Sequence, residues 1–214
     1  MPKYNAALFD LDGVIVNTAK YHYLAWKKLA KELGFDFTER DNERLKGISR
    51  IASLEILLEI GDLSFDDSTK DQLAAKKNAD YVNYVNKMDA SEILSGAKEC
   101  LLRLREKGVK TAVVSASKNA PRILDNLHIA HLFDAVIDGN KALKAKPDPQ
   151  VFLLAAQELC MEPHECVVFE DAEAGIQAAK AAGMFAVGIG QPDILSAANV
   201  VIAGLDSFDV DSLF

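Results

Sequence analysis

The segment Ala6-Ala7-Leu8-Phe9-Asp10-Leu11-Asp12-Gly13-Val14 begins with an unbroken apolar run and ends in two acidic residues. An apolar run without polar alternation is typical of a strand covered on both faces of a parallel sheet. Gly13 allows the backbone to turn sharply away from such a strand. Residues two apart in extended backbone point the same way, so Asp10 and Asp12 are expected to face one site. The structural alternative is a pair of loop acids that cap the next helix.

Five further apolar runs have the same character and are predicted to be strands of the same sheet. They cover residues 109–114, 135–137, 166–169, 186–189 and 200–202. Helical patterns lie between them, over residues 95–107 and 172–182, and from an N-cap at Asp148 through a first helical Pro149 to residue 159. Strands that alternate with helices predict an α/β fold with a doubly wound, Rossmann-like parallel sheet.

Residues 17–89 interrupt this alternation. They contain apolar residues at helical spacing, such as Leu54, Leu57 and Leu58, and no convincing strand. We therefore predict an all-helical cap over residues 17–89, inserted after the first strand. Residues 1–16 and 90–214 are predicted to form the α/β catalytic core.

The composition narrows the class of protein. The 24 basic and 32 acidic residues give a net charge of −8, which disfavours nucleic-acid and membrane-surface binding. No apolar run reaches the roughly 18 residues that span a bilayer. The three cysteines (Cys100, Cys160 and Cys166) are too few and scattered for a disulfide framework or a zinc site, and we expect reduced core residues. The chain is expected to be a cytoplasmic monomer without nucleic-acid or membrane partners.

Polar residues that suit phosphate chemistry stand at three further places along the core. Ser115 follows the second strand, Lys146 precedes Pro147, and Glu170-Asp171 follows the fourth strand. A hydroxyl with backbone N–H groups that open a helix can cradle phosphate, a lysine supplies a point charge, and paired carboxylates suit Mg²⁺. Taken singly, each has a structural alternative: a serine N-cap, a solvated loop lysine and a helix-capping aspartate. Because the carboxyl ends of parallel strands meet at one rim, we expect the four groups to converge.

These residues resemble a known family. Asp10-Leu-Asp-Gly-Val, Ser115-Ala-Ser-Lys, Lys146-Pro and Glu170-Asp171 are similar to the four motifs of the haloacid dehalogenase superfamily. The segment Leu45-Lys-Gly-Ile-Ser-Arg50 is similar to the sugar-phosphate mutases of that superfamily. The resemblance implies Mg²⁺-dependent interconversion of β-D-glucose 1-phosphate and D-glucose 6-phosphate. It also implies an aspartyl-phosphate enzyme, with β-glucose 1,6-bisphosphate as intermediate and activator.

The same resemblance assigns roles to individual residues. Asp10 would be the nucleophile and Asp12 the general acid/base, while Ser115 and Lys146 would neutralise charge on the phosphoryl group. The implied Mg²⁺ ligands are Asp10, the Asp12 backbone carbonyl, Asp171 and Glu170, the last with or without an intervening water. The implied substrate-binding residues are Thr18, Trp26, Lys46, Gly47, Arg50, Lys77, Ala116, Ser117, Lys118 and Asn119.

Several alternatives stay open at this point. Arg50 could be a surface residue paired with an acid, Lys77 could lie on a solvated helix face, and Trp26 could be packed in the cap core. His22, four residues after Thr18, is expected to be structural. A phosphatase on the same fold would let water attack the aspartyl phosphate instead of a sugar hydroxyl. A phospho-accepting signalling module without turnover is a more distant alternative, and it would need no helical insertion.

Overall fold

The sheet is the centre of the fold. The computed structural model describes residues 4–45, 48–142 and 144–214. Six strands pair in parallel in the order β3-β2-β1-β4-β5-β6. They are β1 (Ala6–Phe9), β2 (Lys110–Val114), β3 (Ala135–Ile137), β4 (Cys166–Glu170), β5 (Phe185–Ile189) and β6 (Val200–Ile202). The predicted fold class is confirmed, and each predicted strand agrees with the structure to within one residue at either end.

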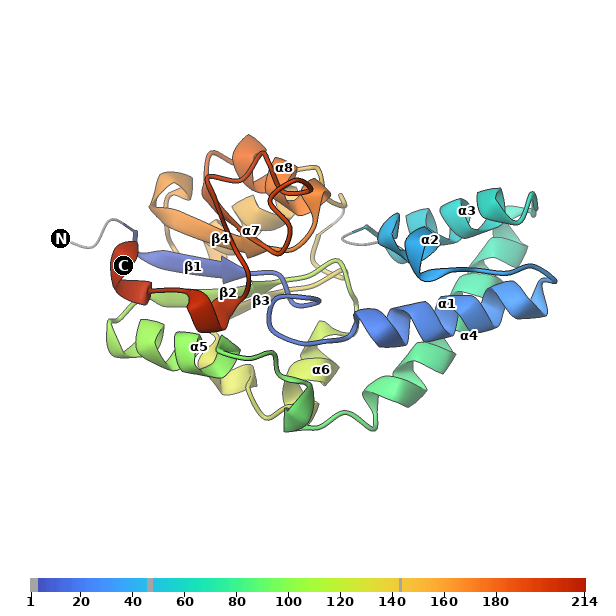
Figure 1. The fold of residues 1–214 in the computed structure, drawn as a ribbon, viewed down its shortest axis with the longest axis horizontal. Coiled ribbons are helices and arrows are strands. Elements are labelled where there is room, and N and C mark those ends of the chain that lie inside the picture. Colours follow the sequence, from blue (N-terminus) through green and yellow to red (C-terminus); the bar gives the residue numbers. More distant parts are fainter. Residues whose placement is uncertain (1–3, 46–47, 143) are drawn as a thin grey trace.

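Helices cover both faces of this sheet (Figure 1). The helices α5 (Ala97–Glu106) and α6 (Ala120–Asn126) lie on one face, and α7 (Gln150–Glu158) and α8 (Glu173–Ala181) on the other. Side chains alternate between the two faces. Phe9 packs in the buried cluster that includes Leu101 of α5, whereas Leu8 packs in the cluster that includes Phe152 of α7. Burial on both faces explains why the strands are apolar throughout.

Four helices follow β1 and form the all-helical cap at one end of the sheet (Figure 1). They are α1 (Ala19–Glu32), α2 (Glu39–Glu43), α3 (Arg50–Ile60) and α4 (Asp67–Val85). Apolar residues of α1, α3, α4 and the segments between the cap helices form a separate core, in which Leu54 and Leu57 are fully buried. Five 3₁₀ turns connect other parts of the chain: Ala90–Glu92, Ala130–Leu132, Pro163–Glu165, Leu205–Ser207 and Val210–Ser212. No helix among the described residues has the length and apolar character needed to cross a membrane.

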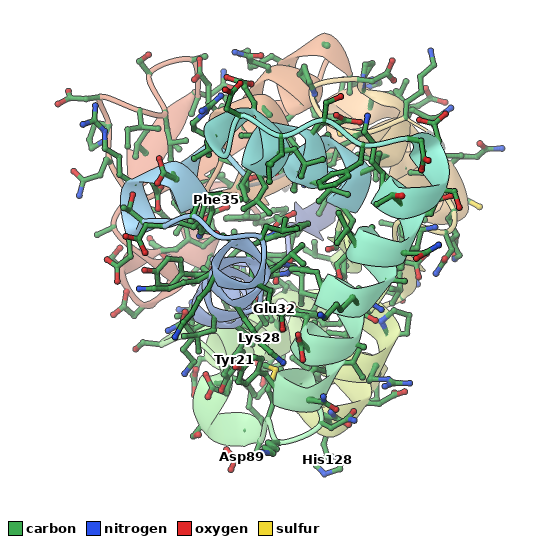
Figure 2. All side chains as sticks on the ribbon, turned by 90° about the vertical axis from the view of Figure 1, so that its right-hand side faces the viewer. Tyr21, Lys28, Glu32, Phe35, Asp89 and His128 are labelled. Atoms are coloured by element: carbon green, nitrogen blue, oxygen red, sulfur yellow. The ribbon has the colours of Figure 1, made fainter. Side chains whose placement is uncertain are left out.

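Polar contacts join α1 to α4 along the outside of the cap. Figure 2 looks at the cap from its outer end, and Tyr21, Lys28 and Glu32 lie along the side of α1 next to α4. Lys28 Nζ lies 2.6 Å from Asp80 Oδ1, and Lys76 Nζ lies 2.7 Å from Glu32 Oε2. The ring of Tyr21 stacks on that of Tyr84. These links support packing of α1 and α4 as one unit.

One local prediction agrees with the structure and one is corrected. Asp148 acts as the predicted cap of α7, because its Oδ1 accepts a hydrogen bond from the Gln150 N–H at 3.0 Å and Pro149 already has helical φ and ψ, although the helix is assigned from Gln150. Cys100 and Cys166 are buried as expected, but Cys160 is exposed. Cys160 has a φ of +56°, in the left-handed turn that ends α7, and this turn places it at the surface.

The order of the strands places a ligand crevice at one point of the sheet. The chain runs from β1 outward to β3 on one side and from β4 outward to β6 on the other. Ligands in open α/β sheets bind outside the carboxyl ends of the two strands at which this direction reverses. Here those strands are β1 and β4. Their pairing in register carries Asp10 and Glu170 to the same edge, where the Asp10 N–H donates to the Phe169 carbonyl.

Candidate active site

Three charged side chains meet in the protein interior beyond β1 and β4. Lys146 Nζ donates to Asp10 Oδ1 at 2.6 Å and to Glu170 Oε1 at 2.5 Å, and it lies 3.3 Å from the Val114 carbonyl oxygen. All three side chains are buried, with Glu170 fully inaccessible to solvent. The solvated-loop alternative for Lys146 is therefore wrong. Buried charges of this kind persist only when they are paired and hydrogen-bonded, so each member depends on the other two.

Burial and charge act in opposite directions on this cluster. Burial raises the pKa of Asp10 well above its usual value, Lys146 lowers it, and the neighbouring carboxyl groups raise it further. Burial works against the charge on Lys146, but Asp10 and Glu170 outweigh it and raise the pKa of Lys146. Lys146 therefore stays protonated and holds a positive charge beside the Asp10 carboxyl group.

Asp12 lies in a different environment from Asp10. Burial raises the pKa of Asp12 to about 6, although Lys146 and Lys77 oppose the shift. Its Oδ1 atom is buried without a hydrogen-bond partner in the described part of the chain, and the same holds for Thr18 Oγ1 and Tyr81 Oη. A carboxyl group with a pKa near neutrality, and with no strong partner for one oxygen, is suited to carry a proton.

The acidic residues offer a set of oxygen ligands. Asp10, Glu170 and Asp171 each present a carboxylate oxygen, and these oxygens lie within 4.8 Å of one another. Hard oxygen donors in such a group fit Mg²⁺. Gly13 has a φ of +85°, and a Cβ there would overlap the Asp171 carboxylate. The Asp12 carboxylate does not belong to this group. A role for the Asp12 backbone carbonyl stays a prediction.

The loop after β2 is organised by its own serines. Ser115 Oγ accepts a hydrogen bond from the Ser117 N–H, and Ser117 Oγ accepts one from the Asn119 N–H. Among the described residues, the N–H groups of Ala116 and Lys118 have no protein acceptor. Ser115 is not a helix N-cap, because Asn119 takes that position for α6. The loop therefore leaves alternate N–H groups free to bind an anion.

Arg50 and Lys77 of the cap do not lie at the surface, where the structural alternatives in the sequence analysis would place them. Arg50, the first residue of α3, is half-buried and pairs with no acid within residues 4–45, 48–142 and 144–214. Lys77 is 2% exposed, although its neighbour Lys76 is solvated. Lys77 Nζ lies within hydrogen-bond distance of His22 Nδ1, at 2.9 Å, and 4.4 Å from the ring centroid of Trp26. The surface-pair interpretation of Arg50 and the solvated-face interpretation of Lys77 are both wrong.

A cavity of about 850 Å³ separates the cap from the carboxyl edge of the sheet. Its volume lies within the range of small-molecule sites. Most predicted site residues line it: Asp10, Asp12, Trp26, Arg50, Lys77, Ser115, Ala116, Ser117, Lys118, Asn119, Lys146 and Asp171. Trp26 also packs in the cap core as the structural alternative expected, and its contact with substrate stays a prediction. Thr18 and Glu170 are fully buried behind the lining. Lys46 and Gly47 lie outside the described residues.

Among the lining residues that sequence reasoning did not assign to the site are Tyr81 and Asn78. Tyr81 is 1% exposed, and its ring packs against that of His22 with 4.1 Å between the centroids. It lies four residues after Lys77 and so shares a helix face with it. The spacing would have predicted that Tyr81 lines the cavity only if Lys77 had already been known to face it.

The burial of Lys77 predicts a specific dependence of stability on pH. Burial and Arg50 lower the pKa of Lys77 to about 7. Between about pH 7 and the unfolded-state value, the unfolded chain holds one more proton, so this group makes stability rise with pH. Relative to the Lys77→Met variant, wild-type unfolding free energy should gain about 1 kcal/mol per unit between roughly pH 7.5 and 9. Urea unfolding at several pH values measures this difference.

Lys76→Met, which removes the exposed neighbour, is the control. Its unfolding free energy should change with pH in parallel with that of wild type, and a Lys77→Met curve that is also parallel to wild type would contradict the prediction.

Comparison with known proteins agrees with this geometry. A family model of haloacid dehalogenase-like hydrolases matches residues 4–183. A β-phosphoglucomutase of Bacillus subtilis is 44% identical over 92% of this chain and 88% of its own. A phosphorylated carbohydrates phosphatase of Thermotoga maritima is 32% identical over 84% and 82%. The crystal structure of a β-phosphoglucomutase from Clostridium difficile superposes with a TM-score of 0.94 at 40% identity, covering 98% of this chain and 95% of that one. The chain belongs to the haloacid dehalogenase-like hydrolase family.

Proposed function

We propose that this protein is a Mg²⁺-dependent phosphomutase that interconverts β-D-glucose 1-phosphate and D-glucose 6-phosphate. The observation that carries the proposal is the shared cavity, which is lined by Asp10 and Lys146 of the core and by Arg50 of the cap, a residue that pairs with no acid in the described part of the chain. A mutase needs a nucleophile at one end of its substrate and a cationic group for a second phosphate. The similarity to the Bacillus subtilis β-phosphoglucomutase supports the choice of sugar.

In this proposal Asp10 carries the phosphoryl group. Its carboxylate oxygen forms a bond to phosphorus, and the bond from phosphorus to the sugar oxygen breaks. Little other covalent chemistry is required, so the main task of the site is to offset negative charge. Lys146 and the Ser115 hydroxyl lie at this end of the cavity. The unused N–H of Ala116 can donate to a phosphoryl oxygen.

Asp12 moves the proton in each half of the reaction. It takes the proton from the 6-hydroxyl of β-glucose 1-phosphate as that oxygen attacks the aspartyl phosphate, which frees the Asp10 carboxylate and yields β-glucose 1,6-bisphosphate. It returns the proton to the C1 oxygen when Asp10 takes the C1 phosphoryl group and glucose 6-phosphate leaves. The pKa of about 6 lets Asp12 serve as base and acid near neutrality. Because the two transfers involve different sugar oxygens, the bisphosphate must present each phosphate to Asp10 in turn.

The second phosphate requires its own binding groups. Arg50 suits this role because a guanidinium makes bidentate contacts to phosphate oxygens. Lys118 and the loop N–H groups stand across the cavity from the cap and can share the charge. We infer that the cap, within residues 17–89, closes on this phosphate and excludes water from the aspartyl phosphate.

Magnesium fits the acidic set described above. Asp10, Glu170, Asp171 and the Asp12 carbonyl would hold the ion, which when bound offsets the charge of the transferred phosphoryl group. Lys146 and the Ala172 N–H already occupy both Glu170 oxygens, which supports a Glu170 contact to the ion through water. A monomeric state and a cytoplasmic location stay predictions from composition.

A sugar-phosphate phosphatase is the second candidate function, because the Thermotoga maritima relative is a phosphatase. It would use the same Asp10 chemistry and let water attack the aspartyl phosphate. A phospho-accepting module without turnover is disfavoured, because such a module needs neither Asp12 nor an enclosing cap.

One assay separates the two candidates. Purified protein with Mg²⁺, β-glucose 1-phosphate and a trace of β-glucose 1,6-bisphosphate is followed for glucose 6-phosphate and inorganic phosphate together. We expect fast formation of glucose 6-phosphate with little free phosphate. Stoichiometric phosphate release with little glucose 6-phosphate would identify a phosphatase instead.

Replacement of the proton carrier should affect poor and good leaving groups differently. Asp12→Asn is expected to lower isomerisation by a factor of about 10² to 10⁴, the usual contribution of a general acid/base. The initial burst of alcohol from an activated aryl phosphate should fall much less, since that leaving group needs no proton. Stopped-flow absorbance measures the burst, and an equal loss in both reactions would refute the assigned role.

Replacement of Arg50 should lower the rate of isomerisation much more than the rate of simple phosphate release. Arg50→Ala is expected to lower kcat/KM for isomerisation about 10-fold to 100-fold, the usual value of hydrogen bonds to a charged group. Phosphate release from a small aryl phosphate, which has no second phosphate, should be nearly unchanged. Arg44→Ala is the matched control, because Arg44 is a cap arginine that pairs with Glu59 outside the cavity. Equal losses in both reactions would count against a distal-phosphate site at Arg50.

A further inference from the structure

A hydrogen bond between two asparagine side chains joins the cap to the loop after β2, across the cavity. Asn119 Nδ2 donates to Asn78 Oδ1 at 2.9 Å. Asn78 belongs to the cap helix α4, and Asn119 stands at the N-terminus of α6 in the core. Both residues line the cavity. The Asn78–Asn119 hydrogen bond therefore spans the boundary at which a substrate would be enclosed.

Asn119 stands at the N-cap position of α6, but its side chain does not cap that helix. An asparagine at an N-cap commonly accepts a hydrogen bond from the first helical turn. Asn119 makes no such side-chain bond to α6. Its amide has two donor hydrogens and an acceptor oxygen, so the bond to Asn78 leaves one hydrogen and the oxygen available to a ligand. Asn78 thereby sets the orientation of an amide that borders the ligand space.

Two further side-chain hydrogen bonds in the described part of the chain join the end of α4 to α6, and they lie at the base of the cap. Asn86 Oδ1 accepts from Arg122 at 3.4 Å, and Asn126 Nδ2 donates to the Val85 carbonyl at 2.8 Å. None of these residues lines the cavity. They stand where α4 ends and the chain returns to the core (Figure 1). Asn78 lies eight residues earlier, about 12 Å along the helix, so rotation of the cap about this base moves Asn78 much further than Asn86.

We propose that Asn78 is a positioning residue, which holds the Asn119 amide in place and keeps the cap shut while Asp10 is phosphorylated. The inference rests on the proposed mutase function and extends it, because it names the contact that protects the aspartyl phosphate from water. The bond forms only when α4 lies against the core loop. The second phosphate is therefore gripped by a complete set of groups only in the closed state, and loss of Asn78 lets water compete with the sugar hydroxyl.

The partition between products tests this role. Phosphate released per glucose 6-phosphate formed is measured for wild type, Asn78→Ala, Asn119→Ala and the double variant. Asn78→Ala should raise the ratio about twofold to tenfold, the usual value of one hydrogen bond. The double variant should match Asn119→Ala, because the two residues act through one bond. An unchanged ratio in Asn78→Ala, or independent effects that multiply, would overturn the proposal.

Asn86→Ala is the matched control, since it removes the asparagine that caps the end of α4 and contacts α6 away from the cavity. It should leave both the ratio and the isomerisation rate unchanged, and an effect equal to that of Asn78→Ala would overturn the proposal. If wild type forms no glucose 6-phosphate, the proposed function fails, and the position of the cap is then measured directly. Small-angle X-ray scattering should give a larger radius of gyration for Asn78→Ala than for wild type and Asn86→Ala. Identical radii would overturn the role of Asn78 itself.

Discussion

The Lys146 ammonium group donates a hydrogen bond to Asp10 and another to Glu170, and the rest of the site is arranged around these two buried ion pairs. Two carboxyl groups at the ends of neighbouring strands are buried close together in a medium of low polarity, and the buried ammonium group offsets their negative charge by donating a hydrogen bond to each. Both acids can reach one cation because β1 and β4, the strands at which the chain's progress across the sheet reverses, are neighbours. A glycine at position 13 is needed for a related reason, since any side chain would overlap Asp171.

The cap completes what the sheet begins. The acids and the lysine at the carboxyl edge of the sheet would be open to solvent without the cap. Water could then attack the aspartyl phosphate in place of a sugar hydroxyl. The helices α1 to α4 have their own core and meet the sheet around a cavity, so they can move as a body without loss of their internal packing. Contacts near the end of α4 join the cap to the core at its base, whereas Asn78 reaches the core at the far side of the cavity.

Charge distribution reconciles an acidic protein with an anionic ligand. The net charge is −8, yet the cavity has Lys146 on the core side and Arg50 and Lys77 on the cap side. Surface charges beyond about 8–10 Å are screened by salt, so the nearby cations determine what binds. Burial gives Lys77 a second property, because its pKa falls to about 7 and its charge depends on what enters the cavity. An anion placed there would favour the protonated form.

Unbroken apolar runs and the residues that follow them were sufficient to predict the strands, the helical insertion and the convergence of Asp10, Ser115 and Lys146. Those features depend on local patterns, and a parallel sheet converts order along the chain into position along one edge. The burial of Lys77 and the bond between Asn78 and Asn119 could not be predicted in this way. Helical spacing shows which residues share a face, but it does not show which distant segment covers that face. Only the packing of α4 against α1 and α6, helices far apart in the sequence, buries Lys77 and brings Asn78 and Asn119 together beside the cavity.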